Sequence, residues 1–474
     1  MNRTIQVTAW LSILVQGQVL AASADAESPR KTVWVDLIQK TEPAVVAIVR
    51  QDAGGKTLTG SGSIIHEAGF ILTSDSVVQG QEGYVLLKGQ PPIPYQAVGR
   101  LPERDLALIR VKADRTLTAM TLGRSQDLMA GEPILVGGNP GAMGVTFSSG
   151  IVGSTSVAAS TPDALEMSLF TSDAMDRYIR FDARAGADFV GGPVLNAEGR
   201  LVGVVTARGL AQEDAHLAIP VDRVRASFYD LVAPEERGDF WTGMEVDLMA
   251  AGAVVTGMDP NGPGAKAGLR IGDRIVSLYG RPMRDGPDWI MSLVGRKTNE
   301  ALVLTLGREK KQQVSLTLQV CPVAPGLADE GLSEGLWYAV FQGRFSTLPD
   351  FLNLKPVYDG NAPAPQAVAL PGIPDRDYAL VFAGYVEIPK RGAYRVVLGS
   401  DGWSRLYLDR RVTVDNKGPS AYQESSTVCR LDAGLHPMRI EYLQATAFPE
   451  LQLRIEPDAP SGGQTPIPLQ FYCE

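Results

Sequence analysis

Histidine and cysteine, two residue types that often transfer protons or bind metal ions near neutral pH, are scarce in this chain. The sequence contains three histidines, His66, His216 and His436, and three cysteines, Cys321, Cys429 and Cys473. Any chemistry that needs an imidazole must therefore use one of three residues. No Cys-x-x-Cys motif and no histidine pair with zinc-ligand spacing occurs, so we expect neither a metal site nor a cofactor.

A nucleophile loop is indicated at residues 186–193, which read Gly-Ala-Asp-Phe-Val-Gly-Gly-Pro. Two apolar, strand-like runs joined by a turn at 197–199 follow it. The loop resembles the nucleophile loop of trypsin-like serine proteases of the HtrA (DegP) type, in which a serine directly precedes Gly-Gly-Pro. Here that position is Val190, whose side chain has no heteroatom that could attack a carbonyl.

The elements that would position this loop carry the same resemblance. Short β-branched runs separated by turn residues predict an all-β barrel or sandwich. Motifs similar to those of the HtrA family occur in the family's order at 60–65, 69–78, 104–109, 138–152, 179–193 and 218–220. The resemblance implies a trypsin-like double β-barrel over residues 31–232, with a helix after Pro220.

The resemblance also assigns the catalytic positions. It places Asp105 at the family's aspartate, Ser76 at its histidine and Val190 at its serine. Loss of base or nucleophile alone costs roughly 10⁴ to 10⁶ in kcat. We therefore expect a non-catalytic protein, a pseudoprotease, in which these three positions are vestigial.

Two further residues bear on that expectation. Asp188 stands where the family has an oxyanion-hole glycine, and its carboxylate would repel a developing negative charge. The alternative is an active serine endopeptidase with a rearranged site, which requires His216, or His66 from an expected solvated turn, near a hydroxyl such as that of Ser76.

Residues 236–321 form the second predicted domain. Residues 264–280, which contain Ala-Gly-Leu-x-x-Gly-Asp-x-Ile from 267 to 275, resemble a PDZ signature, and PDZ domains bind extended or C-terminal peptides by strand addition. The resemblance implies that the loop Trp241, Thr242, Gly243 and Met244 captures the peptide carboxylate, and that Trp289, Ile290 and Leu293 form the far wall. The alternative is a spacer packed on the barrel.

A Pro/Gly/acidic linker leads to the third domain, residues 333–457. Its alternating strands resemble the protective-antigen-type domain, a jelly-roll-like β-sandwich often attached to secreted glycan-active or adhesive proteins. Asp401, Trp403 and Tyr407 are the glycan-binding candidates; the alternative is that Tyr407 belongs to the core and Trp403 covers a loop. Gly402 breaks the acidic pair of calcium-dependent members, so no calcium is expected. Residues 458–474 are rich in Pro, Gly and Ser and are expected to form a flexible tail.

The chain as a whole is expected to be mainly β and exported. Residues 1–26 have the charge, apolar core and small-residue sites of a signal peptide, which implies a periplasmic or secreted protein. The net charge of −9 excludes a general attraction to nucleic acid, and no later run could span a membrane. The expected partners are peptides of exported or envelope proteins, a glycan or cell-surface component, and further copies of the chain. A purely adhesive protein with the barrel as a spacer is the other alternative. One disulfide is possible, and a Cys429–Cys473 bond would tie the tail to the last domain.

Overall fold

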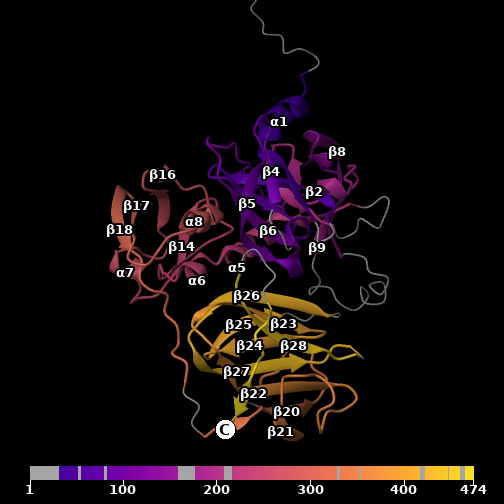
Figure 1. Ribbon diagram of the computed structural model, residues 1–474, viewed down its shortest axis with the longest axis vertical. Helices are drawn as coiled ribbons and strands as arrows, with labels where there is room; N and C mark the ends of the chain where they lie inside the picture. The colour runs from indigo at the N-terminus through magenta and orange to yellow at the C-terminus, as the bar shows by residue number, and fades with distance from the viewer. Residues whose placement is uncertain are drawn as a thin grey trace, which may run out of the picture.

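The computed structural model describes residues 31–51, 55–79, 83–158, 177–207, 216–327, 331–351, 354–416, 422–446, 448–459 and 465–473. The signal peptide predicted for residues 1–26 lies outside these ranges. Strands dominate, as Figure 1 shows, and the mainly β fold is confirmed. Within the described ranges no helix is both long enough and apolar enough to cross a membrane.

Two closed six-stranded barrels make up the first domain. The first has the order β1-β2-β3-β6-β5-β4, with β1 (Val45–Gln51), β2 (Thr57–His66), β3 (Phe70–Thr73), β4 (Gly83–Leu86), β5 (Ile93–Leu101) and β6 (Leu106–Val111). The second has the order β10-β11-β12-β9-β8-β7, with β7 (Pro133–Gly138), β8 (Thr146–Ala158), β9 (Arg177–Phe181), β10 (Pro193–Asn196), β11 (Leu201–Val205) and β12 (His216–Pro220). Closure pairs every strand edge while the β-branched side chains fill the interiors, so the predicted double barrel is confirmed.

Short helices surround and leave the barrels. They are α1 (Val33–Thr41), α2 (Asp75–Val78), α4 (Val221–Ala226), α5 (Phe228–Val232) and α6 (Pro234–Gly238). The helix predicted after Pro220 is present as α4 and α5, and Val221, Val224, Phe228 and Leu231 are fully buried. The core of the first barrel continues through Phe228 into the second domain as one apolar cluster, so the two bodies are packed together.

The second domain is a small sheet with one covering helix. Its strands are β13 (Met244–Val246), β14 (Ala253–Met258), β15 (Arg274–Leu278), β16 (Arg281–Pro282), β17 (Ala301–Gly307) and β18 (Lys311–Thr317), and its helices are α7 (Pro263–Lys266) and α8 (Gly286–Leu293). The Asp285 carboxylate caps α8 by accepting the Asp288 N–H at 2.9 Å. The sheet order β13-β14-β15-β17-β18 leaves β13 at one end.

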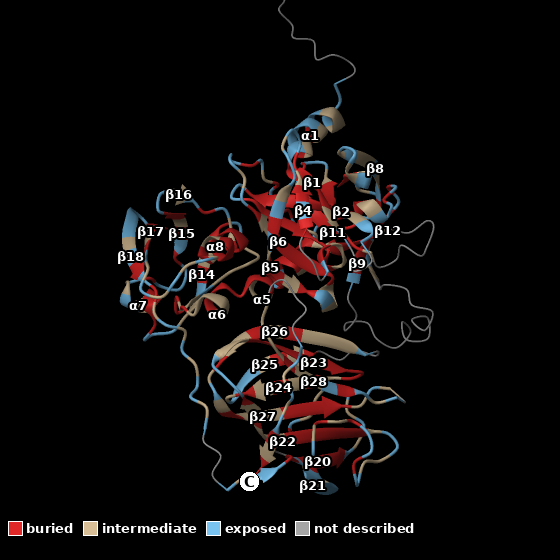
Figure 2. Ribbon diagram, in the orientation of Figure 1, coloured by how far each residue is buried: buried red, intermediate tan, exposed pale blue. Residues whose placement is uncertain are grey.

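The third domain is a sandwich of two sheets. The larger contains β19 (Ser333–Glu334), β20 (Leu336–Gln342), β21 (Tyr358–Ala362), β22 (Tyr378–Ile388), β24 (Ser404–Leu408), β25 (Arg411–Asn416), β27 (Gly434–Leu443) and β29 (Phe471–Cys473). The smaller has the order β26-β23-β28, with β23 (Gly392–Ser400), β26 (Gln423–Leu431) and β28 (Leu451–Pro457). Buried residues gather between the two sheets (Figure 2), as a jelly-roll-like sandwich requires.

The structure corrects two expectations about the C-terminal region. Residues 471–473 do not belong to a flexible tail, because β29 pairs with β19 and β22 and buries Phe471. All three cysteines carry free thiols. Cys429 lies on β26 and Cys473 on β29, in different sheets, so the favoured Cys429–Cys473 bond is absent.

The third domain rests on the helices that join the first two (Figure 1). Strand β26 faces α5 and α6. Across this contact the Arg237 guanidinium donates two hydrogen bonds of 2.6 and 3.1 Å to the Asp458 carboxylate, and Ser426 Oγ donates to Glu103 Oε1 at 2.7 Å. The three domains therefore meet at the linker helices.

Candidate functional site

The 186–193 loop lies between the two barrels and is held by its own backbone. A short 3₁₀ turn, η4 (Ala187–Phe189), leads into Val190, whose N–H donates to the Ala187 carbonyl at 3.2 Å. The Val190 carbonyl accepts the Ser61 N–H at 2.8 Å. Gly191 has φ +84°, and a Cβ there would lie 2.1 Å from Thr73 Oγ1, so only glycine fits this point of the loop.

Asp188 anchors the same loop to strand β2. Its carboxylate accepts the Thr59 hydroxyl at 2.5 Å, and its carbonyl accepts Ser61 Oγ at 2.6 Å. Val190 is buried. In this arrangement the Val190 N–H, one of the two donors that an oxyanion hole would use, is engaged within the loop.

Asp105 and Ser76 come together as the resemblance implied. Asp105 sits in the left-handed region (φ +50°) just before β6, and its buried carboxylate accepts Ser74 Oγ at 2.5 Å, the Ser76 N–H at 3.0 Å and Thr206 Oγ1 at 2.6 Å. The Ser74 and Ser76 hydroxyls lie 2.6 Å apart. Sequence reasoning missed Ser74 and Thr206. Ser74 could have been found from its place two residues before Ser76, in the motif 69–78.

The histidines considered for a rearranged site lie elsewhere. His66 is buried rather than in a solvated turn, with Nε2 3.2 Å from Asp288 Oδ1 and 2.8 Å from Arg281 Nη1, and it joins the first barrel to α8. His216 packs beside Phe181, and burial lowers the pKa of its imidazole. In the described part of the chain, neither ring is hydrogen-bonded to Asp105 or to the serines beside it.

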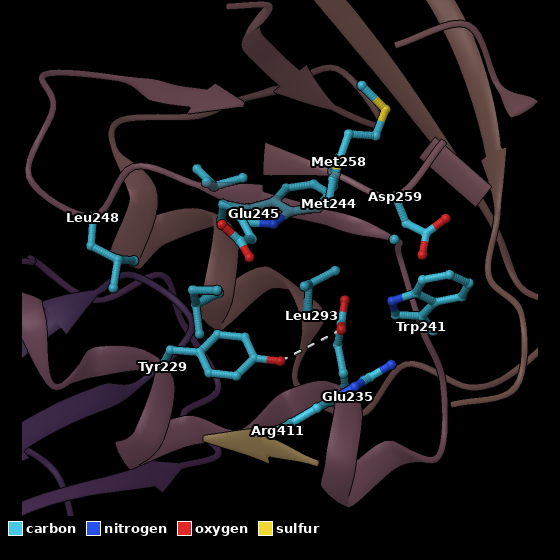
Figure 3. A pocket seen from close by; sticks show the side chains of 14 residues that line it. Tyr229, Glu235, Trp241, Met244, Glu245, Leu248, Met258, Asp259, Leu293 and Arg411 are labelled. Carbon is cyan, nitrogen blue, oxygen red and sulfur yellow. Dashed lines mark hydrogen bonds between the residues drawn. The ribbon is translucent and has the colours of Figure 1, made fainter. Parts of the chain in front are cut away.

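A groove of about 630 Å³ runs along the second domain between β13 and α8 (Figure 3). The predicted wall residues Trp289, Ile290 and Leu293 line it from α8 and are almost fully buried. Trp241, Gly243 and Met244 line the opposite side, while Thr242 is buried behind them. The structure therefore brings the predicted loop and wall to one groove.

The polar lining of the groove was not predicted. It comprises Tyr229, Glu235, Glu245, Asp259 and Arg411. Glu235 Oε1 accepts the Thr242 N–H at 3.0 Å and also the Thr242 hydroxyl. Burial raises the pKa of the Glu235 carboxyl, although the bonds from Thr242 act in the opposite direction. Arg411 reaches the groove from β25 of the third domain, as Figure 3 shows.

The glycan-binding candidates do not form one exposed surface. Asp401 is only 2% exposed, and its carboxylate accepts Tyr442 Oη at 2.5 Å, Thr446 Oγ1 at 2.8 Å and the Glu450 N–H at 2.9 Å. Trp403 is half-buried against an apolar cluster that includes Phe341 and Phe351, and Tyr407 is half-buried on β24. Asp401 therefore stabilises the surrounding loops by hydrogen bonds. Of the three candidates, only the two aromatic side chains offer surface to a ligand. Across the described residues, no group of three or more His, Cys, Asp and Glu side chains is arranged to hold a metal ion.

Comparison with known proteins identifies all three domains. Residues 60–204 match the trypsin-like peptidase domain, residues 254–306 the PDZ domain and residues 332–461 the PA14 domain. The chain is 26% identical over 361 residues to a probable periplasmic serine endoprotease DegP-like of Bartonella henselae, covering 70% of this chain and 67% of the relative. It is 27% identical over 288 residues to the DegP-like protein of Brucella suis and 31% identical over 279 residues to the periplasmic serine endoprotease DegP of Escherichia coli K12, and it spans only 53% and 56% of their lengths. The solved structure of an HtrA-type protease AlgW with tripeptide is 24% identical, with a TM-score of 0.37 over 62% of this chain and 99% of that one.

These relatives correct one expectation. The chain was expected to be a non-enzymatic protein, but the curated relatives are named serine endoproteases. Nothing in the described residues shows that the chain lacks activity. The same relatives are named as periplasmic proteins.

Proposed function

We propose that this chain, which carries trypsin-like peptidase, PDZ and PA14 domains, binds extended peptide segments of exported or envelope proteins. The observation that supports this function best is the groove between β13 and α8. Strand β13 ends the sheet and pairs only with β14 among the described strands, so its other edge can receive a peptide as an added strand.

The groove can supply a moderate affinity. Two apolar peptide side chains buried against the apolar lining of the groove, which includes Met244, Val246 and Met258, contribute about 1.5–3 kcal/mol each. A few strand hydrogen bonds add about 0.5–1.5 kcal/mol apiece. After the cost of ordering the peptide, a dissociation constant in the micromolar range, about −8 kcal/mol, is expected.

The setting of the proposal is the periplasm or the medium beyond it, reached through the signal peptide at residues 1–26. The relatives' names support this setting. A chain that assembled with further copies of itself would present several grooves to one unfolded polypeptide and so bind it more tightly.

Fluorescence polarisation with labelled apolar peptides tests the binding. Met244→Glu places a charge in the groove and is expected to weaken binding at least tenfold. Ile271→Glu is the matched control, because Ile271 is 65% exposed and does not line the groove. If no peptide binds the intact protein, or both variants bind as well as the parent, the groove is not the binding site.

Peptide-bond hydrolysis in the first domain is the second candidate. The run of hydroxyls from Ser76 through Ser74 to the Asp105 carboxylate favours it, because a serine that attacked a carbonyl could pass its proton along this run. A carboxylate is a much weaker base than imidazole, so a slow rate is expected.

Hydrolysis is tested with a fluorophosphonate probe and unfolded casein on the purified protein. Labelling that maps to Ser76 or Ser74 and disappears in Ser76→Ala or Ser74→Ala would support a rearranged site. Absence of both labelling and cleavage would refute it. Glycan binding by Trp403 and Tyr407 stays a prediction, and a sugar array tests it.

A further inference from the structure

The loop that faces the end of the peptide groove already holds a carboxylate. Glu235 lies on α6, seven residues before Thr242, and its side chain turns back into the groove (Figure 3). Its Oε1 accepts the Thr242 N–H at 3.0 Å and the Thr242 hydroxyl, while Oε2 lies 3.5 Å from Tyr229 Oη. Glu235 is only 9% exposed, so this position is built into the fold rather than adopted by a free surface chain.

These bonds use part of the set of donors that a peptide terminus would need. Domains that bind by strand addition capture a C-terminal carboxylate with backbone N–H groups of the loop that precedes the receiving strand. In this loop the Thr242 N–H is bound to Glu235, and the Trp241 N–H donates to the Gln319 carbonyl at 2.8 Å. A second carboxylate at the same place would lose a donor and lie against the charge of Glu235.

The remaining charges of the groove do not compensate. Glu245 and Asp259 line the same groove, and Arg411 is the single cation among the lining residues. Arg411 enters from the third domain, and among the described residues its guanidinium forms no ion pair with Glu235. The charged lining of the groove is therefore mainly acidic, which disfavours a free carboxylate and leaves the apolar wall available to a chain that continues past the 241–244 loop.

We propose that Glu235 takes the place of a ligand's C-terminal carboxylate, so that the groove selects internal segments of extended polypeptides over free C-termini. This inference rests on the proposed peptide-binding function and names its ligand class. The ligand is an apolar stretch within an unfolded chain, with an amide rather than a carboxylate opposite Thr242. Glu235 is thus a specificity-determining residue, and it lies in the linker between two domains.

The test compares one apolar peptide sequence in three forms: with a free C-terminal acid, with a C-terminal amide, and placed in the middle of a longer peptide. Binding to the intact protein is measured by fluorescence polarisation. The amide and internal forms are expected to bind at least as tightly as the acid. Glu235→Ala removes the carboxylate from the loop and frees the Thr242 N–H, so it is expected to raise the ratio of the affinity for the acid to that for the amide about tenfold or more.

Two further variants keep the result interpretable. Glu235→Gln keeps an oxygen for the Thr242 N–H but removes the charge, so a rise of about threefold is expected. Glu309→Gln is the control, because Glu309 is exposed on the turn between β17 and β18, outside the groove, and the ratio should stay as in the parent.

A parent protein that prefers the free acid tenfold would overturn the proposal, and so would a Glu235→Ala protein whose ratio is unchanged. If neither Glu235 variant folds, as judged by thermal unfolding, the ratio measured on the parent alone decides. Failure of every form to bind would refute the peptide-binding function instead.

Discussion

The contact between Arg237 and Asp458 gives the sharpest prediction about stability. The Asp458 side chain is 1% exposed and that of Arg237 is 14% exposed, and two bonds of 2.6 and 3.1 Å join them. Arg237 Nη1 also donates to the Val98, Leu231 and Val232 carbonyls at 2.7 to 3.0 Å. One side chain therefore holds the first barrel, the α5 helix and the third domain.

Replacing Arg237 with methionine leaves the Asp458 carboxylate buried beside Arg395, whose Nη2 is 3.7 Å away. Removing one partner of a buried ion pair costs about 3–5 kcal/mol. Because Arg395 compensates in part, we expect a loss near the lower end, about 3 kcal/mol, in the transition that releases the third domain. Replacing both partners, in Arg237→Met with Asp458→Asn, should cost less than the sum of the two single changes, with a coupling energy of about 2 kcal/mol.

Urea unfolding followed by circular dichroism and tryptophan fluorescence measures these losses, with each transition fitted separately because a chain of three domains need not unfold in one step. Arg344→Met is the matched control. Arg344 pairs with Asp377 at the surface with its side chain 83% exposed, so its loss should leave the transition almost unchanged. A cost below about 1 kcal/mol for Arg237→Met, or single effects that simply add, would refute the reasoning.

Three further outcomes are expected from other parts of the molecule. Burial, and then the charge of Glu235, raises the pKa of the Glu236 carboxyl from 4.5 to about 7, so the folded state binds this proton more tightly than the unfolded state does. The free energy of unfolding should therefore fall by up to about 3 kcal/mol as the pH rises from 4.5 to 7. In urea titrations at several pH values, Glu236→Gln should flatten this slope. Gly191→Ala should destabilise the first domain by well over 1 kcal/mol in thermal unfolding, whereas Gly89→Ala, where φ is +72° and no atom lies within 4 Å of the added Cβ, should cost about 1 kcal/mol. Burial alone would raise the pKa of the Asp288 carboxyl, but hydrogen bonds from His66 and Arg284 hold this pKa well below 3.8. The stabilising contribution of Asp288 is therefore present above pH 3.8 and disappears only in stronger acid. Asp288→Asn should lower the free energy of unfolding by about 2–4 kcal/mol, and an unchanged melting temperature would exclude this role.

The sequence could predict the parts of the structure that depend on short local patterns of residues. The runs of β-branched residues between turns indicated the barrels, and the Ala-Gly-Leu signature indicated the second domain with its α8 wall. The positions of Ser76 and Asp105 followed from ordered motifs. Each of these inferences depends on residues a few positions apart, where periodicity and turn chemistry act directly.

The features that the sequence did not reveal depend on contacts between segments that are far apart along the chain or that meet at a sharp change of direction. Ala233 at φ +39° and Pro234 start α6 at an angle that carries Glu235 to Thr242, which no periodicity encodes. Arg411 lines the groove from more than a hundred residues away along the chain, and His66 is buried where Asp288 of α8 lies 3.2 Å from its Nε2. The strand at 471–473 follows a segment rich in Pro and Gly, and its pairing with β22 supplies the order that its own sequence lacks.

The way the third domain sits on the linker helices has a consequence for the hydrodynamics of the chain. Domains joined by flexible linkers tumble independently and give a broad distribution of distances between atoms of different domains. Here the Arg237–Asp458 ion pair joins α6 to the residue after β28, and β26 is hydrogen-bonded to Asp230 of α5 and to Glu103 of the first domain. The barrels, the second domain and the sandwich should therefore rotate as one particle with a single correlation time.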